Sequence, residues 1–372
     1  MKVLHINTNY LHTPLHSELI SGLEARGIHN CILMPRKKND NQHLAKNLKP
    51  HQAKVIHKQI LDIKDRFLYF YKQRKISNWI SSENVDTDEY DILHAHTLYS
   101  DGYVAYKSNK PYVITVRNTD VNYFIKYYKH LKKIGMKILI NAKAIIFLSE
   151  VYKITTINKL FKKEEDRKTI LEKSYVLPNG INDFWIENQN NIKKNLNDSV
   201  NFLFVGRVMK NKNIKYTAEQ LNVMFKQDNV TFHIVGPVID RRYFKEIMSI
   251  PNVKYHGELN KSDILSLMKS MDVFIMISHK ETFGLVYLEA LTQNLPLLYT
   301  SNQGFDGYFR EGEVGYSIRI DDKSDFKKKA YSILRNYDSV QENIINIEKS
   351  SFTWDSNIEK HIDIYNNVDR IS

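Results

Sequence analysis

The sequence predicts an α/β protein built from two doubly wound, Rossmann-like domains. Short, β-branched apolar runs alternate along the chain with stretches of helical periodicity, starting with a strand at 2–6 and a helix at 17–26. The alternation starts again at Asn201, and 372 residues are enough for two domains. We expect a first domain at residues 1–186, a linker at 187–200, a second domain at 201–354 and a final helix at 355–372.

The composition is typical of a globular protein. Hydrophobic residues make up 42% and charged residues 26% of the chain, which are ordinary values for a soluble domain. No apolar run approaches the roughly 20 residues that a membrane span needs, and the chain starts directly with an expected strand rather than a signal peptide. The single cysteine, Cys31, excludes an internal disulfide. We therefore expect a cytoplasmic protein.

Positive charge is concentrated in the first half of the chain. Residues 1–180 hold 30 Lys and Arg against 17 Asp and Glu, a net +13, whereas the remaining residues hold 24 against 25, a net −1. This asymmetry indicates an anionic partner for the first half, which can be a membrane surface, a nucleic acid or a phosphorylated acceptor. The alternative is a lysine-rich surface that is simply solvated.

The first domain is expected to form a parallel sheet with crossover helices. Strands are expected at 2–6, 31–34, 91–96, 111–116 and 144–148, and helices at 17–26, 65–80, 124–140 and 151–161. The polar and basic stretch 36–60 is expected to be an irregular insertion. No Gly-x-Gly-x-x-Gly follows the first strand, which weighs against a nicotinamide enzyme.

Two histidines alternate on one strand of this domain. His94 and His96 point to the same face of the sheet, but a metal site needs a third ligand, and the sequence offers no obvious one. Asp86-Thr87-Asp88 lies in an acidic turn just before the strand, where we expect solvated carboxylates rather than metal ligands. No metal site is therefore expected.

The segment from Phe124 to Ile140 is expected to form a cationic amphipathic helix. At about 100° per residue, its aromatic and aliphatic residues fall on one side and its lysines on the other. Such a helix can lie in the interface of an anionic bilayer, or it can pack on the sheet with its lysines in solvent.

The second domain starts with the run NFLFVGRVMKNK, which is a strand followed by Gly206, Arg207 and Lys212. Further strands are expected at 231–235, 253–257, 272–277 and 295–298. Fixed positive groups at the end of a strand suit a phosphorylated ligand, because they stabilise its negative charge. A surface Arg/Lys pair without a ligand is the alternative.

The most informative stretch is the strand, loop and helix between Met271 and Asn302. Backbone N–H groups around Phe283, Gly284 and Leu285 open the helix and are placed to hold an anion. Glu281 and Glu289 are about 80° apart around a helix, so we do not expect them to share one task as a paired acid and base. A nucleotide-sugar, with an anionic middle and hydroxyls at both ends, fits this arrangement. Two solvated glutamates on an exposed helix are the alternative.

Four segments occur in the order seen in glycosyltransferase family 4, which the chain resembles. They are Pro178-Asn179-Gly180, Gly206-Arg207 with Lys212, Gly236-Pro237, and the ETFGLVYLE run from Glu281 to Glu289. The resemblance implies the GT-B fold, with two Rossmann-like domains facing a central cleft and a C-terminal helix crossing back to the first domain. It also implies retaining sugar transfer from a nucleotide-sugar.

The resemblance assigns roles to individual residues. The expected catalytic residues are Glu281, Arg207 and Lys212, and the expected donor-binding residues are Gly206, Arg207, Lys212, Glu281, Thr282, Phe283, Gly284, Leu285 and Glu289. His96, Arg117 and Asp120 are expected on the acceptor side. Arg117 stands where many relatives carry a histidine, and an arginine stays protonated and cannot shuttle a proton. No metal or other cofactor is expected, since the two cations neutralise the diphosphate.

The expected acceptor is a saccharide or a lipid-linked saccharide, in the synthesis of a bacterial surface polysaccharide or glycoconjugate. Membrane contact through Phe124 to Ile140 would place the protein at the inner face of the cell membrane. Two alternatives remain open: a sugar-nucleotide epimerase of the same fold, and a non-enzymatic binder of an anionic polymer. Nucleic acid is not expected as a partner, because the aromatic residues alternate with core positions and form no stacking platform.

Overall fold

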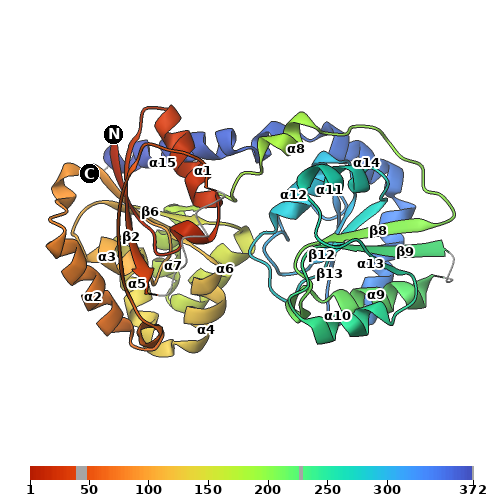
Figure 1. Cartoon of the computed structure of the whole chain (residues 1–372), viewed down its shortest axis with the longest axis horizontal. Coiled ribbons are helices and arrows are strands. Elements are labelled where there is room, and N and C mark those ends of the chain that lie inside the picture. The colour runs from red at the N-terminus through yellow and green to blue at the C-terminus, as the bar shows by residue number, and fades with distance from the viewer. Residues whose placement is uncertain (39–47, 226–228, 371–372) are drawn as a thin grey trace. The chain divides into compact units, whose positions relative to one another are not determined.

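A seven-stranded parallel sheet forms the centre of the first part of the chain (Figure 1). The computed structural model describes residues 1–38, 48–225 and 229–370. The strand order is β3-β2-β1-β4-β5-β6-β7. The strands are β1 (Lys2–Ile6), β2 (His29–Lys37), β3 (Lys54–Leu61), β4 (Ile92–Ala95), β5 (Tyr112–Val116), β6 (Ala144–Phe147) and β7 (Ser174–Val176). Every pairing between neighbouring strands is parallel.

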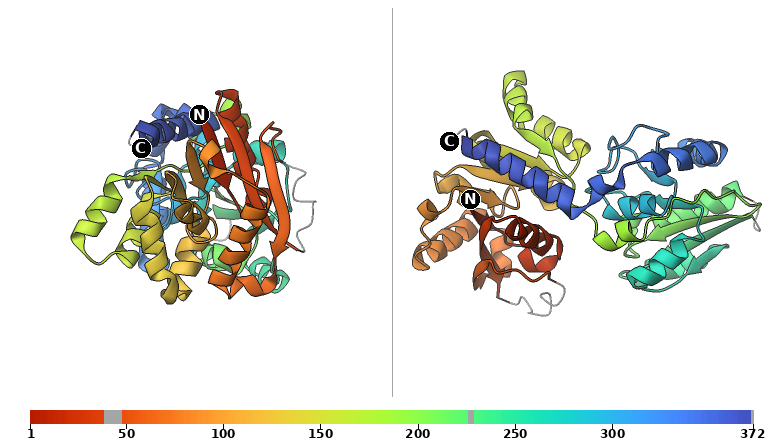
Figure 2. Two further views of the ribbon diagram at one scale, coloured as in Figure 1. Left: turned by 90° about the vertical axis from the view of Figure 1, so that its left-hand side faces the viewer. Right: turned by 90° about the horizontal axis from the view of Figure 1, so that it is seen from above.

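Helices cover both faces of this sheet (Figure 2). They are α1 (Leu15–Ala25), α2 (Tyr69–Ser82), α3 (Gly102–Lys107), α4 (Ile125–Tyr127), α5 (Lys132–Asn141), α6 (Glu150–Leu160), α7 (Glu164–Glu172) and α15 (Trp354–Arg370). Alternate residues of each strand point to opposite faces. Val3 therefore packs with α1 and α15, whereas Leu4 packs in a second core with α3, α5 and α6.

The stretch 36–60 was expected to be an irregular insertion. This prediction is wrong at both ends of the stretch, where the chain forms regular strands. Strand β2 continues through Pro35 to Lys37, and Lys54–Leu61 forms β3 beside it. In β3 only Leu61 is fully buried, because β3 is an edge strand. An edge strand needs little apolar periodicity, so its sequence carries a weak signal. Residues 39–47 of the stretch lie outside the described residues.

The segment from Phe124 to Ile140 is not one helix, which corrects a second prediction. A π-helical turn, η5 (Asp120–Phe124), leads into α4, and a 3-10 turn, η6 (Lys129–Leu131), precedes α5. The break falls at Tyr128, with φ −104° and ψ 65°. Most of the apolar side packs inward, where Leu131 and Ile138 are completely buried, whereas Tyr127 is exposed. This is the sheet-packed arrangement, with the lysines of the segment directed outward.

A six-stranded parallel sheet forms the centre of the second part of the chain, in the order β10-β9-β8-β11-β12-β13. The strands are β8 (Val200–Val205), β9 (Val230–Val235), β10 (Val253–Tyr255), β11 (Val273–Met276), β12 (Leu297–Thr300) and β13 (Gly315–Ile318). The helices are α8 (Asp183–Glu187), α9 (Ile214–Met224), α10 (Arg241–Met248), α11 (Lys261–Met268), α12 (Leu285–Thr292), α13 (Lys323–Arg335) and α14 (Tyr337–Asn346).

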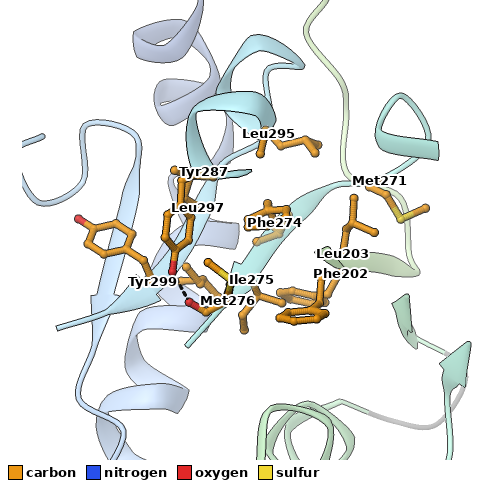
Figure 3. Close-up of a cluster of buried hydrophobic side chains, with 14 of the residues drawn as sticks. Phe202, Leu203, Met271, Phe274, Ile275, Met276, Tyr287, Leu295, Leu297 and Tyr299 are labelled. Atoms are coloured by element: carbon orange, nitrogen blue, oxygen red, sulfur yellow. Dashed lines mark hydrogen bonds between the residues drawn. The ribbon is translucent and has the colours of Figure 1, made fainter. Parts of the chain in front are cut away.

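Strand β11 lies in the middle of this second core (Figure 3). All four of its residues are buried, and Phe274 and Ile275 pair with Leu297 and Leu298 of β12. The Tyr287 hydroxyl of α12 donates a hydrogen bond to the carbonyl of Met276 (Figure 3). This bond fixes α12 against the end of β11, so the loop between them has little freedom.

The chain divides into two compact units after Gly180. Unit 1 comprises Met1–Leu148, Tyr152–Gly180 and α15, and unit 2 comprises Ser149–Val151 and Ile181–Thr353. The first domain was expected to end at residue 186, whereas unit 1 has its division from unit 2 after Gly180, and α8 therefore belongs to unit 2. Helix α15 packs on α1 of unit 1, as expected of the final helix. No helix in the described part of the chain is long and apolar enough to cross a bilayer.

The expected linker at 187–200 lies along unit 2 rather than free of it. The Asn190 N–H donates to the Thr292 carbonyl at 2.8 Å, and the Lys194 N–H donates to Gln341 Oε1 at 2.8 Å. The Lys194 ammonium also donates to the carbonyls of Met268 and Met271, and burial lowers its pKa to about 8. The segment has no apolar periodicity because polar groups hold it in place.

Candidate functional site

In each sheet there is one point from which the strands continue in opposite directions along the sheet, and we locate the candidate sites at these two points. In unit 2 the reversal lies between β8 and β11, which are neighbours although they are far apart in sequence. Ligands of open α/β sheets bind outside the carboxyl ends of the strands at such a point. Gly206, Arg207 and Lys212 follow β8, and the loop 278–284 follows β11. The structure therefore brings the two predicted motifs of unit 2 to the same edge.

Two glycines form the floor of this site. Gly206 has φ 158° and donates its N–H to the Val235 carbonyl at 2.9 Å. Gly236, at the end of β9, has φ 130°, and a Cβ there would lie 2.2 Å from the Gly206 carbonyl oxygen. Only glycine permits this approach of the two strand ends. The floor is therefore bare backbone, which leaves room for a ligand.

Lys212 and Glu281 form the central polar contact of the site. Their Nζ and Oε2 atoms are 2.6 Å apart, and the two side chains are only 15% and 16% exposed. Lys212 ends the 3-10 turn η7 (Lys210–Lys212), whereas Arg207 is exposed at the start of the same loop. The loop after β8 therefore carries a largely buried, ion-paired ammonium and an exposed guanidinium.

The loop that carries Glu281 is held on both sides. Its N–H donates to Gln303 Oε1 at 3.0 Å, and its carbonyl accepts from the Gly304 N–H at 2.9 Å. On the other side, Asn211 accepts from the His279 N–H and donates to the Lys280 carbonyl. Asn211 was not predicted from the sequence, because a side-chain amide that binds backbone has no characteristic spacing.

The start of α12 presents backbone N–H groups, as predicted. Gly284 has φ 86° and caps the helix, and Leu285 is its first residue. Phe283 is buried among Phe305 and Tyr308, with ring centroids 5.6 and 5.0 Å away. The Phe283 side chain thus anchors the loop, and any ligand contact at this residue has to use its backbone. Unpaired N–H groups at a helix N-terminus favour an anion.

Glu289 lies in the fifth position of α12, in a more apolar environment than Glu281. Burial raises its pKa to about 7, while Lys261 and the indole N–H of Trp185 partly offset this effect. Trp185 comes from α8, just after the division between the units. A carboxyl group with this pKa can accept a hydrogen bond from a hydroxyl at neutral pH and is sensitive to small pH changes.

The three residues predicted on the acceptor side cluster in unit 1, near the carboxyl ends of β4 and β5. Asp120 is fully buried and accepts from the backbone N–H groups of Leu98, Tyr99 and Arg117 at 2.9–3.1 Å. Arg117 donates from Nε to the His96 carbonyl at 3.0 Å, and burial lowers its pKa to about 10. Asp120 thus shapes the loop, and Arg117 as a whole is half-buried.

His96 belongs to a group of five buried histidines, of which the sequence reading found two. His94 and His96 stack at 4.1 Å between ring centroids, and His5 of β1 lies beside both. His16 of α1 and His361 of α15 complete the group from the covering helices. Burial lowers the pKa of all five, to about 4 for His5 and His361. The cluster is therefore neutral at pH 7.

A third histidine, His5, lies beside His94 and His96, as a metal site would need, but ring nitrogens of these histidines form hydrogen bonds with protein groups. Ring nitrogens of His5, His94 and His96 lie within 4.8 Å of one another. His94 hydrogen-bonds through one nitrogen to the Tyr365 hydroxyl and through the other to Thr115, and His5 bonds to Asn30 and His96. Stacked rings also cannot direct their nitrogens at one ion. The arrangement fits a hydrogen-bonded network that joins β1, β4 and α15.

Fold and site together define a class of protein. Two Rossmann-like units are present. At its switch point unit 2 has glycines, two cations, a helix N-terminus and Glu281, and Glu289 follows in the fifth position of that helix. These groups suit a ligand with a diphosphate between two hydroxyl-rich ends, which is the structure of a nucleotide-sugar. The class is therefore that of the nucleotide-sugar-dependent GT-B proteins.

Comparison with known sequences places the chain within this class. The family model for group 1 glycosyl transferases matches residues 186–350, and that for glycosyltransferase family 4 matches residues 17–183. The chain belongs to the group 1, or family 4, glycosyltransferases, which are enzymes that transfer sugars. The capsular polysaccharide biosynthesis glycosyltransferase CapM of Staphylococcus aureus is 30% identical over 235 residues, which are 60% of this chain and 58% of CapM.

Solved structures show the same fold. Sucrose-phosphate synthase of Thermosynechococcus elongatus superposes with a TM-score of 0.72 at 16% identity, over 100% of both chains. HepE of Anabaena, solved in complex with UDP-glucose, superposes with a TM-score of 0.66 at 15% identity, over 98% of both chains. At these identities the likeness establishes the GT-B fold that the sequence predicted.

Proposed function

We propose that this protein is a retaining glycosyltransferase that moves a sugar from a nucleotide-sugar to a saccharide or lipid-linked saccharide acceptor. The proposed setting is bacterial surface polysaccharide or glycoconjugate synthesis in the cytoplasm, at the inner face of the cell membrane. The observation that carries the proposal is the Lys212–Glu281 contact of 2.6 Å at the switch point of unit 2. CapM, whose name assigns it to capsular polysaccharide synthesis, supports the setting.

In the proposed donor complex, the diphosphate lies over Gly206 and against the first N–H groups of α12. Arg207 and Lys212 neutralise its charge, and they take the place that a metal ion has in other transferases. Glu281 orients the sugar through its hydroxyl groups, and Glu289 accepts from the ribose. Thr282, Phe283, Gly284 and Leu285 contribute backbone groups.

The proposed chemistry uses the donor itself as the base. The bond between the anomeric carbon and the phosphate oxygen breaks, and the acceptor oxygen bonds to the same face of that carbon. The acceptor proton passes to the departing phosphate oxygen. Retention by double displacement would need a second carboxylate about 5 Å from the first, and the eight-residue separation of Glu281 and Glu289 on one loop and helix does not suggest such a pair.

On the acceptor side, Arg117 is the proposed contact in unit 1. Its guanidinium can bind a phosphate or carboxylate through two parallel hydrogen bonds, which suits an acceptor carrying such a group. His96 and Asp120 are proposed to position Arg117. The His96 carbonyl accepts a hydrogen bond from Arg117 Nε, and the Asp120 carboxylate accepts one from the backbone N–H of Arg117.

The first experiment is a thermal-shift panel of UDP-, GDP- and ADP-sugars, each with and without EDTA. We expect stabilisation by one nucleotide class that EDTA does not change, and the HepE complex with UDP-glucose makes UDP-sugars the first to test. Loss of the shift with EDTA would refute the metal-free site. The absence of any shift would refute donor binding.

Single substitutions then test the two cations. Arg207→Ala and Lys212→Ala should each lower turnover by about 10²–10³-fold, because each removes a fixed charge from the leaving group. Lys210→Ala is the matched control, since Lys210 is an exposed lysine in the same turn η7. Equal turnover of Lys212→Ala and Lys210→Ala would contradict the assignment. NMR of the anomeric configuration of the first product tests retention directly.

A further inference from the structure

A pocket of about 690 Å³ lies on unit 1, between the end of α1, the start of β2 and residues 50–53. We name it the α1–β2 pocket, and Glu24, His29 and Gln52 each come from one of its three sides. Small molecules bind in concave sites of about 300–1,000 Å³ that combine apolar walls with a few polar groups. The pocket therefore has the size of a ligand site, and the proposed sugar transfer makes no use of it.

The pocket lies at the opposite end of the sheet from the candidate acceptor residues of unit 1. His29 begins β2, so the pocket is at the amino ends of the parallel strands, whereas Arg117 and Asp120 follow the carboxyl end of β5. The nine residues of β2, from His29 to Lys37, span roughly 26 Å at about 3.3 Å per residue. A small ligand in the pocket therefore cannot contact the residues of the acceptor side.

The turn between α1 and β2 is held in one conformation. Gly27 has φ 77°, which a glycine adopts without strain. The Gly27 N–H donates to the Glu24 carbonyl at 2.9 Å, and the Ile28 N–H donates to the Leu23 carbonyl at 3.1 Å. These bonds satisfy carbonyl groups at the end of the helix. The turn therefore presents a fixed edge to the pocket.

Residues 50–53 are tied to the rest of unit 1 beside the pocket. The Gln52 N–H donates to Glu24 Oε2 at 2.8 Å. The Nε2 atom of His51 forms a hydrogen bond with the Tyr10 hydroxyl, and Tyr10 is buried. The walls of the pocket are thus in place without a ligand, so binding costs little ordering of the protein.

Several polar side chains at the pocket are available to a ligand. The side chains of Ser21, His29 and Gln52 form no hydrogen bond or ion pair with other described residues. Together with the Glu24 carboxylate they provide both donors and acceptors. A carboxylate or a carboxamide presents two polar atoms side by side, which match two adjacent hydroxyl groups of a sugar ring.

The charge of the pocket favours a neutral ligand. Of the described residues that line it, Glu24 is acidic and none is a lysine or an arginine, so a phosphate or a nucleotide has no cation to bind. Burial lowers the pKa of His51, which Glu24 partly offsets, so the imidazole is neutral at pH 7. A cationic ligand would be repelled by the net +13 of residues 1–180.

The apolar part of the pocket consists of small groups. Ala25, Ile28 and Pro50 line it, and Phe, Tyr and Trp are absent from its described lining. A nucleobase or another aromatic ring would find no aromatic side chain on which to stack. Short aliphatic surfaces instead suit the C–H groups of a sugar ring, whose hydroxyl groups lie at its edge.

We propose that the α1–β2 pocket binds a short segment of a neutral oligosaccharide. Hydroxyl groups of the saccharide bond to Glu24, His29 and Gln52, and the C–H face of a ring lies against Ala25 and Pro50. The pocket is separate from the transfer site of the proposed function and holds a saccharide without reacting with it. Binding is measured with no nucleotide-sugar present, so its failure is distinguishable from the failure of sugar transfer.

The test is NMR of the full chain with isotope-labelled histidine side chains, titrated with maltotriose, cellotriose and triacetylchitotriose. We expect the resonances of His29 and His51 to shift with at least one trisaccharide and to saturate at millimolar concentrations, while those of His256 in unit 2 do not shift. Glycerol at the same concentration of hydroxyl groups is the control for non-specific contact. Inorganic phosphate is the control for an anionic ligand.

Substitutions locate the binding. His29→Ala with Gln52→Ala should lower the affinity, followed at His51, at least fivefold, because two hydrogen bonds are lost. The matched control is His57→Ala with Gln59→Ala, since these two residues are exposed on β3 and do not line the pocket. The control pair should bind as the wild type does. Circular dichroism establishes that each variant is folded.

Ala25→Trp provides a second variant, because it fills the pocket from the last residue of α1, and it should abolish the shifts. The proposal is overturned if no trisaccharide shifts His29 or His51, or if glycerol or phosphate shifts them equally. It is also overturned if the pocket variants bind as well as the β3 control. Shifts confined to His96 would assign saccharide binding to the acceptor side instead.

Discussion

Substituting Gly22 by alanine should destabilise unit 1 through one identifiable contact. Gly22 lies on the side of α1 that packs against α15. A Cβ at this position would come within 1.9 Å of Ile358 Cδ1 and 2.9 Å of its Cγ1. Ile358 is 2% exposed and packed in the core of unit 1, so it has little space into which it can move.

Two effects of opposite sign determine the magnitude. Overpacking a tight interface costs about 1–3 kcal/mol, while alanine in a helix is favoured over glycine by about 1 kcal/mol. We therefore expect Gly22→Ala to lower the free energy of unfolding by about 1–2 kcal/mol. Ile358→Ala removes both atoms of the clash and by itself costs about 2–5 kcal/mol. In that background, Gly22→Ala should raise the free energy of unfolding by up to about 1 kcal/mol.

The assay is urea unfolding of the four members of this double-mutant cycle, followed by tryptophan fluorescence and circular dichroism. Trp354 begins α15 and reports on its release. The expected result is a change of sign between the two backgrounds, which is a coupling free energy that distant, independent sites do not show. Equal destabilisation by Gly22→Ala in both backgrounds would refute the packing argument.

Two further predictions concern pH and the donor loop. The five clustered histidines of unit 1 have folded pKa values below the unfolded value of about 6.5. The stability of the folded state that depends on their being neutral is therefore intact above pH 6.5 and is lost as the pH falls toward 4. The depressed pKa of His5 and that of His361 should each lower the free energy of unfolding by about 2 kcal/mol at pH 5. Urea titrations at pH 7 and pH 5 check this, and a flat profile would contradict it. Gly304→Ala would place a Cβ 1.8 Å from the Thr282 carbonyl oxygen. It should weaken donor binding at least tenfold in a calorimetric titration, and unchanged affinity would show that the loop does not contact the donor.

Much of unit 2 could be predicted from the sequence because its signals are local. The strand before Gly206 is a short apolar run with a glycine and a cation directly after it, and the loop and helix of Glu281 to Glu289 are continuous in sequence. Each motif directly follows a buried strand. Because β8 and β11 are parallel neighbours, their carboxyl ends lie at the same edge of the sheet, and Lys212 and Glu281 are therefore close together.

The parts that sequence reasoning missed depend on neighbours that are distant in sequence. His5 pairs in register with His94 through the β1–β4 ladder, and His361 reaches the same cluster from α15. No local pattern connects these positions. The Phe124–Ile140 segment shows the converse case. Most of its periodic apolar residues pack against Tyr99 and the sheet core, but Tyr127 is exposed and the segment is not one helix. In α2, only the burial of Tyr69 and Ile76 shows that Phe70 and Tyr71 face solvent.

The return of α15 to unit 1 affects the order in which the chain can fold during its synthesis. Unit 2 is almost continuous from Ile181 to Thr353, so its core can close as soon as that stretch leaves the ribosome. Unit 1 lacks Ile358 and Tyr365 until α15 has been made. Its β1–β4 histidine face would be covered by α1 alone through the whole translation of unit 2. The half of the chain that is synthesised first is therefore completed last.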